Sequence, residues 1–165
     1  MKSFALAVFL SVFIAAPAVA ADFYAGVNIG SANIDRVGFG SSSSLALLCG
    51  YTIIENVATE VAYTKFGSES SSGVTSEGRA VSIIGIASLP MNDKFSFFAK
   101  FGIASTSWDI SGESVDKDDW TYGFGGAVHV NERIDLRGSY DIFKVSNSVS
   151  NYEQKVMSAG AVFNF

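Results

Sequence analysis

The sequence has little of what would build a disulfide framework, a nucleic-acid-binding surface or a membrane helix. Its only cysteine is Cys49, so no disulfide can form within the chain and no cysteine cluster can hold a metal. Its 16 acidic residues outnumber its 11 lysines and arginines, which argues against nucleic acid as a partner. After residue 20, no stretch reaches the roughly 18 consecutive apolar residues that a membrane helix requires.

Motifs that bind phosphate groups or metal ions are also missing. The chain has no glycine-rich phosphate loop, no HExxH zinc motif and no calcium-loop spacing of acidic residues. We therefore expect no metal and no cofactor. Serine is abundant in the polar stretches, but we read it there as loop composition rather than as a set of nucleophiles.

Residues 1–20 have the anatomy of a secretory signal peptide. Lys2 supplies a positive start, residues 4–16 form an apolar run, and Ala18-Val19-Ala20 is a small-x-small cleavage site. The apolar run is too short for a transmembrane helix and lacks a positive stop-transfer flank. The sequence therefore predicts Sec-type export and a mature domain that spans residues 21–165.

The mature chain is rich in alternation between large apolar residues and small or charged ones. In Trp120–Val130 the large residues occupy every second position, except at Gly126, and in Ile134–Lys144 they oppose a polar set. Successive strand side chains point to opposite faces, so each segment has one bulky face and one small or charged face. Asn131–Arg133 between them fits a tight turn. This pattern favours a barrel with lipid outside and a tightly filled polar lumen inside.

The alternation recurs in eight segments, each near the length of about 9–11 residues that a tilted membrane-spanning strand needs. The predicted strands are Phe23–Ile34, Leu45–Ile54, Val57–Phe66, Arg79–Leu89, Lys94–Trp108, Trp120–Val130, Ile134–Lys144 and Gln154–Phe165. In lipid, only helices and closed barrels satisfy every backbone polar group. We therefore predict an all-β fold, an eight-stranded antiparallel up-and-down transmembrane β-barrel, and we expect it to be a monomer.

The connections between these segments alternate in length. Residues 55–56, 90–93 and 131–133 form short turns, whereas longer connections are rich in serine, glycine and acid. The longer connections, which we predict to be four extracellular loops with mobile serine-rich parts, are residues 35–44, 67–78, 109–119 and 146–151. Short periplasmic turns opposite longer extracellular loops are the layout of outer-membrane barrels.

Aromatic residues gather at the predicted strand ends, where they would form two girdles at the membrane interfaces. On the short-turn side the girdle residues are Phe23, Phe95, Phe97, Phe163 and Phe165, and on the long-loop side they are Trp108, Trp120 and Tyr122. The alternative is that these aromatics are ordinary strand formers scattered through a core.

Three segments resemble the OmpA-like transmembrane domain and the related small, opacity-type, porin-like outer-membrane barrels. Residues 120–143, WTYGFGGAVHVNERIDLRGSYDIF, look like the penultimate hairpin of that family, residues 56–67 like its third strand, and residues 97–102 like its fifth. The terminal Phe165 resembles the signature read by the outer-membrane barrel assembly machinery. The resemblance implies a protein of the Gram-negative cell envelope, in contact with outer-membrane lipids and lipopolysaccharide.

The inward face holds four charged residues, Glu60, Lys100, Arg137 and Asp141, and Asp135 is predicted to lie near the rim. The resemblance implies that Glu60, Lys100 and Arg137 form an interior ion-pair network. A charge inside a narrow barrel needs a partner, because an unpaired one costs several kcal/mol. We interpret the four as a structural lumen cluster, with a weak ion path as the alternative. An eight-stranded lumen is filled by side chains, so we do not expect a general porin.

His129 is the only histidine. A catalytic role needs a serine and an acid within hydrogen-bond reach. Eight-stranded outer-membrane enzymes that act on lipid acyl chains direct their chemistry towards the membrane, whereas His129 is predicted to point inward beside a short turn. We therefore read it as a lumen histidine that is hydrogen-bonded to a neighbour.

These patterns predict a non-enzymatic integral outer-membrane barrel that contributes to envelope integrity or to surface interactions through its loops. The loops contain no tyrosine or tryptophan and a single arginine, Arg36, and so have few of the anchors of interaction hot spots; no particular extracellular partner is indicated. The alternatives are an outer-membrane lipid-modifying enzyme, a weak small-solute pore, and a soluble lipocalin-like barrel with its bulky face turned inward.

Overall fold

The structure, a computed structural model, describes residues 22–34, 41–71, 74–110, 113–146 and 151–165. The predicted signal peptide, residues 1–20, lies outside the described residues. Among the residues described, no helix is long and apolar enough to cross a membrane.

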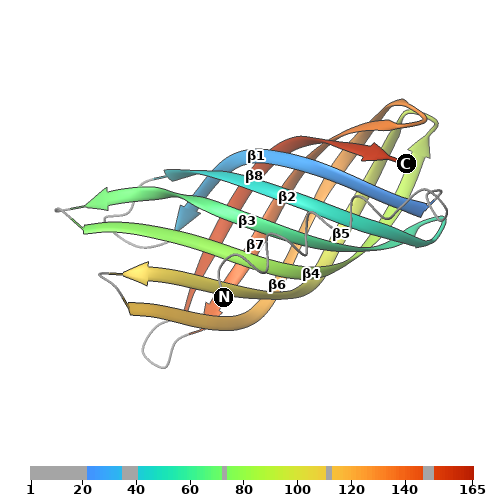
Figure 1. Cartoon of the computed structure of the whole chain (residues 1–165). Coiled ribbons are helices and arrows are strands. Elements are labelled where there is room, and N and C mark those ends of the chain that lie inside the picture. The colour runs from blue at the N-terminus through green and yellow to red at the C-terminus, as the bar shows by residue number, and fades with distance from the viewer. Residues whose placement is uncertain (1–21, 35–40, 72–73, 111–112, 147–150) are drawn as a thin grey trace.

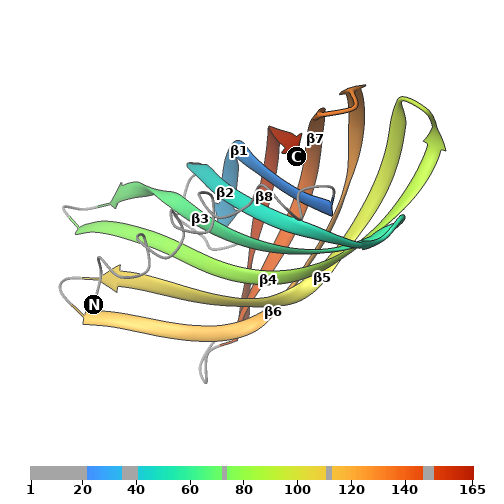
Figure 2. The ribbon, with the colours of Figure 1, turned by 45° about the vertical axis from the view of Figure 1, so that its right-hand side comes forward.

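The described residues form eight antiparallel strands that close into one barrel, because the first strand pairs with the eighth as well as with the second. The strands are β1 (Phe23–Ile34), β2 (Ser41–Ile54), β3 (Val57–Ser71), β4 (Val74–Asn92), β5 (Phe95–Ile110), β6 (Glu113–Asn131), β7 (Ile134–Ser146) and β8 (Asn151–Asn164). Figures 1 and 2 show the strands wound as a tilted cylinder. The predicted eight-stranded up-and-down topology is confirmed.

The tight hairpins and the C-terminus lie at one end of the barrel, the short-turn end (Figure 1). Asn92 ends β4, and its side-chain Oδ1 accepts hydrogen bonds from the backbone N–H groups of Lys94 and Phe95. Asn131 ends β6 and does the same for Arg133 and Ile134. Asparagine stabilises tight turns in this way because its side chain imitates a backbone carbonyl.

At the opposite end, the long-hairpin end, the strands continue further than the sequence predicted. Residues 41–44 belong to β2 and residues 68–71 belong to β3, although both were predicted to be loop, and β4 and β6 each run for 19 residues. The alternation of large and small residues marks only the part of a strand that separates lipid from lumen. Beyond the membrane water reaches both faces, so the backbone pairing can continue without that pattern.

Side chains divide between the two faces by strict alternation. On β5, Phe101 is 59% exposed on the outside of the barrel, whereas the adjacent Lys100 is 8% exposed in the lumen. On β7, Leu136 is 50% exposed and the adjacent Asp135 is 6% exposed. Large apolar residues therefore coat the outer surface, whereas charged residues such as Lys100 and Asp135 lie in the lumen. This arrangement contradicts the soluble, lipocalin-like alternative.

The lumen is narrow enough that large inward side chains need glycine on the neighbouring strand. Tyr24 on β1 faces Gly50 on β2, where an added Cβ atom would clash with the tyrosine ring. Phe98 on β5 faces Gly125 on β6, where an added Cβ atom would lie 2.5 Å from the phenylalanine ring. Glycine at these two positions makes room for an aromatic layer across the barrel.

Candidate functional site

The first of two ion pairs in the lumen joins strands β3 and β7. Arg137 Nη1 lies 3.2 Å from Glu60 Oε2, and the same oxygen accepts a hydrogen bond of 3.3 Å from the Tyr24 hydroxyl. The Arg137 guanidinium lies 4.8 Å from the Tyr24 ring centre and 5.9 Å from that of Phe98. Each charge therefore has a partner, and the guanidinium also lies over two aromatic faces.

The second ion pair joins strands β5 and β7. Lys100 Nζ lies 3.3 Å from Asp141 Oδ1, and Ser139 donates a 2.7 Å hydrogen bond to Asp141 Oδ2. The Ser139 hydroxyl is also 3.1 Å from that of Ser158 on β8. Charges and hydroxyls from three strands thus form one connected group, in which Asp141 has partners on both oxygens.

The structure brings the four predicted lumen residues together, but as two separate pairs. Lys100 is paired with Asp141, whereas Glu60 is paired with Arg137. A cavity of about 30 Å³ lies between the pairs and is lined by Glu60, Lys100 and Asp141 among others. Sequence reasoning missed the hydrogen bond from Tyr24 to Glu60. The alternation places Tyr24 on the inward face, and the glycine opposite it, Gly50, could have indicated a large side chain there.

Towards the long-hairpin end, the part of the lumen that the structure describes contains a buried apolar layer. Phe66 and Phe143 meet edge-on with ring centres 6.0 Å apart. With them pack four small side chains, Ala32, Ala80, Ala104 and Val156. Gln154 on β8, directly paired with Phe143, is fully buried, and neither polar atom of its amide has a hydrogen-bond partner among the described residues. The layer closes the lumen at this end.

At the short-turn end, the lumen opens into a cavity of about 270 Å³. His129 on β6 lies between two partners there. Its Nδ1 is 2.7 Å from Asp135 Oδ1 on β7, and its Nε2 is 3.1 Å from Ser96 Oγ on β5. Asn164 donates a hydrogen bond of 3.0 Å to the other oxygen of Asp135. The sequence placed His129 inward beside a short turn and Asp135 near the rim, but Ser96 and Asn164 were not anticipated.

The predicted girdle residues lie on the outer surface wherever their side chains are described. Tyr122 is half-buried under Lys144, whose ammonium group lies 5.5 Å from the ring centre, and Trp120 stacks on Phe101 at 5.3 Å. The exposed girdle residues are Phe23, Phe95, Phe97, Trp120, Phe163 and Phe165. The side chain of Trp108 lies outside the described set.

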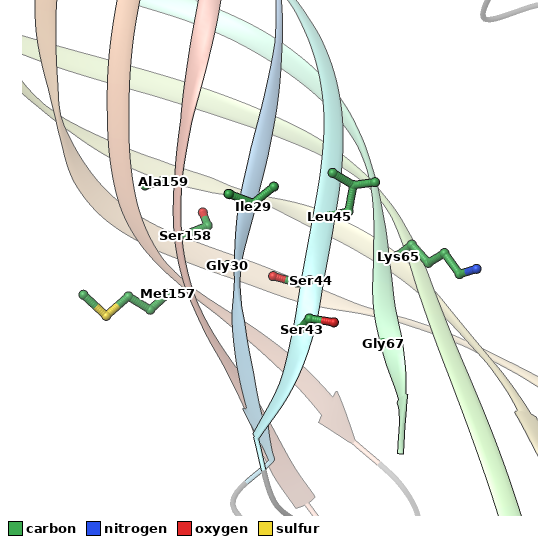
Figure 3. A pocket seen from close by; sticks show the side chains of 10 residues that line it. All are labelled: Ile29, Gly30, Ser43, Ser44, Leu45, Lys65, Gly67, Met157, Ser158 and Ala159. Atoms are coloured by element: carbon green, nitrogen blue, oxygen red, sulfur yellow. The ribbon is translucent and has the colours of Figure 1, made fainter. Parts of the chain in front are cut away.

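A further hollow lies across strands β8, β1, β2 and β3 (Figure 3). It measures about 830 Å³ and is lined by ten residues, among them the outward-facing Ile29, Leu45, Lys65 and Met157. Small neighbours such as Ser43, Gly67 and Ala159 leave room between these longer side chains. The hollow is thus a largely apolar groove with one ammonium group at its edge.

No cluster of three or more histidine, cysteine or acidic side chains that could hold a metal ion occurs among the residues the structure describes. Cys49 lies on the outward face of β2, paired across the sheet with Ala25 and Val61, and it is half-buried.

Two solved structures have the same barrel fold. Neisserial surface protein A is 19% identical, with a TM-score of 0.69, and the match covers 87% of this chain and 97% of that one. Ail, the attachment invasion locus protein of Yersinia pestis, is 14% identical, with a TM-score of 0.62, and the match covers 88% and 99%. At such identities the similarity shows the fold alone.

The outer membrane enzyme PagL is also similar, at 9% identity and a TM-score of 0.59, with 86% of this chain and 99% of that one covered. The fold by itself therefore does not separate enzymes from other barrels. No sequence among the curated proteins matches the chain. The sequence model of the family described as "Outer membrane protein beta-barrel domain" matches residues 4–165. The chain belongs to this family and is a bacterial outer-membrane β-barrel protein.

Proposed function

We propose that the protein is a closed, monomeric barrel that contributes to envelope integrity as an integral element of the outer membrane. The observation that carries this proposal is the filled lumen. Two ion pairs cross it, the cavity between them measures about 30 Å³, and an apolar layer around Phe66 and Phe143 seals the long-hairpin end. Because an eight-stranded barrel is filled by its own side chains, we expect no continuous water path for solutes.

Conductance of the refolded protein in a planar lipid bilayer tests this proposal. We expect no channel openings above the background of protein-free bilayers. Large, stable openings would contradict the closed lumen. Small, infrequent openings that change size in Lys100→Met would support the alternative of a weak small-solute pore, because Lys100 belongs to one of the two ion pairs and lines the cavity inside the lumen.

The proposed role towards membrane lipids is non-enzymatic. The single histidine of the chain points into the lumen rather than towards the lipid, so the outward face lacks the usual general base. Mass spectrometry of lipid A from cells with and without the protein tests this point. Identical lipid A profiles are expected, and loss or transfer of an acyl chain would favour the lipid-modifying alternative.

Surface interaction is the second part of the proposed role. β3–β4 and β5–β6 form the hairpins that extend towards the long-hairpin end (Figure 1), the end that faces the cell exterior in outer-membrane barrels. Cells that lack the protein should take up a hydrophobic dye faster if the barrel supports the envelope. Replacing the tips of both hairpins by short turns should leave dye uptake unchanged but abolish any surface binding.

Lipopolysaccharide is the outer-membrane lipid that the outward face suits best. Lys65 on β3 lies directly opposite Arg79 on β4, and both follow the apolar part of the strand towards the long-hairpin end. The Lys65 ammonium group lies at the edge of the groove, where it can attract a lipid phosphate while an acyl chain lies along Ile29 and Leu45.

Binding of lipopolysaccharide to the barrel in detergent tests this contact. Lys65→Gln should weaken binding about three- to tenfold, since one lysine near a lipid phosphate contributes about 1 kcal/mol. The matched control is Lys94→Gln, which removes a lysine at the opposite, short-turn end. Equal effects of the two substitutions would contradict the assignment.

Assembly through the C-terminal phenylalanine completes the proposal. Phe165 N donates a hydrogen bond of 3.0 Å to the carbonyl of Phe23, and its ring meets that of Phe163 edge-on at 5.3 Å. The end of β8 and the residue after it thus present two exposed aromatics at the short-turn end. Deletion of Phe165 should slow appearance of the heat-modifiable, folded form in cells, whereas Phe95→Ala, which changes an aromatic of the same girdle, should not.

A further inference from the structure

A serine, a histidine and an aspartate, each within hydrogen-bond distance of the next, lie where the lumen opens at the short-turn end. Their order is that of a nucleophile, a general base and an orienting acid. Ser96 Oγ is 3.1 Å from His129 Nε2, and His129 Nδ1 is 2.7 Å from Asp135 Oδ1. Nucleophile, base and orienting acid within hydrogen-bond reach are the signature of covalent catalysis. We propose that these residues form a hydrolytic site for short acyl esters that enter the mouth from the periplasm.

Asp135 is held in the orientation that this role requires. It is 6% exposed, and its second oxygen accepts a hydrogen bond from the Asn164 side chain. A buried carboxylate beside Nδ1 favours the tautomer with the proton on Nδ1. His129 Nε2 is then left to accept the proton of the Ser96 hydroxyl.

The backbone register fixes the three side chains relative to one another. His129 and Asp135 are directly paired across β6 and β7, and Ser96 on β5 is paired with Ala127, two residues before His129 on β6. The Asn131 turn described above ends this hairpin immediately beyond the pair. Side chains on paired strands are held more precisely than side chains on loops.

The mouth leaves the reacting groups accessible. His129 has 38% of its side chain exposed and Ser96 is half-buried, whereas Asp135 is covered. Both reacting groups line the cavity of about 270 Å³. This volume lies just below the range of about 300–1,000 Å³ of pockets for drug-sized ligands. It fits a short acyl group, such as acetyl, rather than a lipid chain.

The cavity walls match the two halves of an ester. Ile86, Phe98 and Ala127 form an apolar cluster at its inner side, where an acyl group can lie. Ser88 and Arg137 also line it and can donate hydrogen bonds to an oxyanion. Arg137 uses one nitrogen, Nη1, to bind Glu60 and keeps further N–H donors on its guanidinium.

The reaction proceeds in two steps, acylation of Ser96 and hydrolysis of the acyl-serine. Ser96 Oγ attacks the ester carbonyl carbon while His129 Nε2 takes the hydroxyl proton, and the tetrahedral intermediate collapses as His129 returns that proton to the leaving alkoxide. The products are an alcohol and an acyl-serine. Water then attacks the acyl carbon with His129 as base, which releases the carboxylic acid and restores Ser96.

The ester-hydrolysing site is separate from the proposed envelope role and does not depend on it. The non-enzymatic role proposed above concerns membrane lipids at the outward face, whereas this site lies inside the barrel at its periplasmic mouth. Conductance and lipid A profiles do not report on Ser96. A failure of one proposal therefore leaves the other intact.

The test uses the refolded barrel in detergent, with heat-modifiable migration on a gel as the measure of folding. Wild-type protein should hydrolyse p-nitrophenyl acetate, and Ser96→Ala and Asp135→Asn should each lower the rate about 10²-fold or to background. The matched control is Ser105→Ala, an exposed serine on the same strand that faces outward. Its rate should equal that of wild type.

A fluorophosphonate probe locates the nucleophile directly. Trypsin releases residues 95–100, FSFFAK, in which Ser96 is the only hydroxyl side chain. The probe mass should appear on this peptide in wild type and should be lost in His129→Gln. The proposal is overturned if folded wild type hydrolyses the ester no faster than Ser96→Ala, or if the peptide stays unlabelled.

Discussion

The two ends of the lumen are closed by different means. The half nearer the short turns is crossed by charged pairs and opens into a cavity of about 270 Å³. The half nearer the long hairpins is filled by an apolar layer in which Phe66 is 1% exposed and Phe143 is 6% exposed. Charges need a partner wherever they are buried, but apolar groups need only close contact. Loss of a single side chain should therefore destabilise the charged half more than the apolar half. The charged half also holds the groups that could carry out a reaction.

Breaking the charged half should have the largest effect on stability. Glu60→Ala removes the partner of Arg137 and the acceptor of the Tyr24 hydroxyl. We expect the free energy of unfolding, measured by urea titration in phospholipid vesicles, to fall by about 3–5 kcal/mol. Glu55→Ala at the exposed β2–β3 turn is the control, with an expected change within about 0.5 kcal/mol. Similar losses in the two variants would show that the pair is not needed.

A substitution in the apolar half should lower the free energy of unfolding less, because it leaves no buried charge without a partner. Phe66→Ala leaves a cavity beside Phe143 and should lower the free energy of unfolding by about 3 kcal/mol. Phe101→Ala on the outer face is the comparison, because lipid replaces the lost ring, and only the stacking on Trp120, about 1 kcal/mol, is removed. A larger loss at Phe101 than at Phe66 would contradict a packed layer inside the lumen.

The smallest loss of stability is expected when the Ser139 hydroxyl, which donates a hydrogen bond to Asp141 of the second ion pair, is removed. Ser139→Ala removes a hydrogen bond to Asp141 but leaves Lys100 beside that carboxylate. The free energy of unfolding should therefore fall by about 1 kcal/mol. Serine to alanine at Ser105, which faces outward, should change nothing measurable. A loss near that of Glu60→Ala would mean that Ser139, rather than Lys100, is the main partner of Asp141.

The membrane-spanning part of the fold was predictable because lipid and lumen demand opposite side chains. Alternation located all eight strands and the turns near Asn56 and Asn131. It failed at residues 41–44 and 68–71, which are strand rather than loop. Outside the membrane both faces of a strand meet water, so sequence alternation carries no signal there.

Parity also placed Glu60, Lys100, Arg137 and Asp141 on the inward face, but it did not give their partners. Partner choice depends on the tilt and stagger of strands around the barrel, which bring β3 and β7 together across the lumen. The same limit hid the contact between Ser96 and His129. These residues are 33 positions apart in the sequence, and the pattern of neither strand by itself predicts the contact.

The division of side chains between lipid and lumen is tested most directly by two adjacent residues of β5. Phe97 is 59% exposed on the outer face, and Phe98 is 6% exposed in the lumen. The two residues therefore lie at nearly the same depth in the membrane, but one faces lipid and the other faces the lumen. Phe97→Trp and Phe98→Trp are compared in a barrel whose native Trp108 and Trp120 are replaced by phenylalanine. Brominated lipid should quench the fluorescence of Trp at 97 strongly and leave that at 98 nearly unchanged. Equal quenching at both positions would contradict the account.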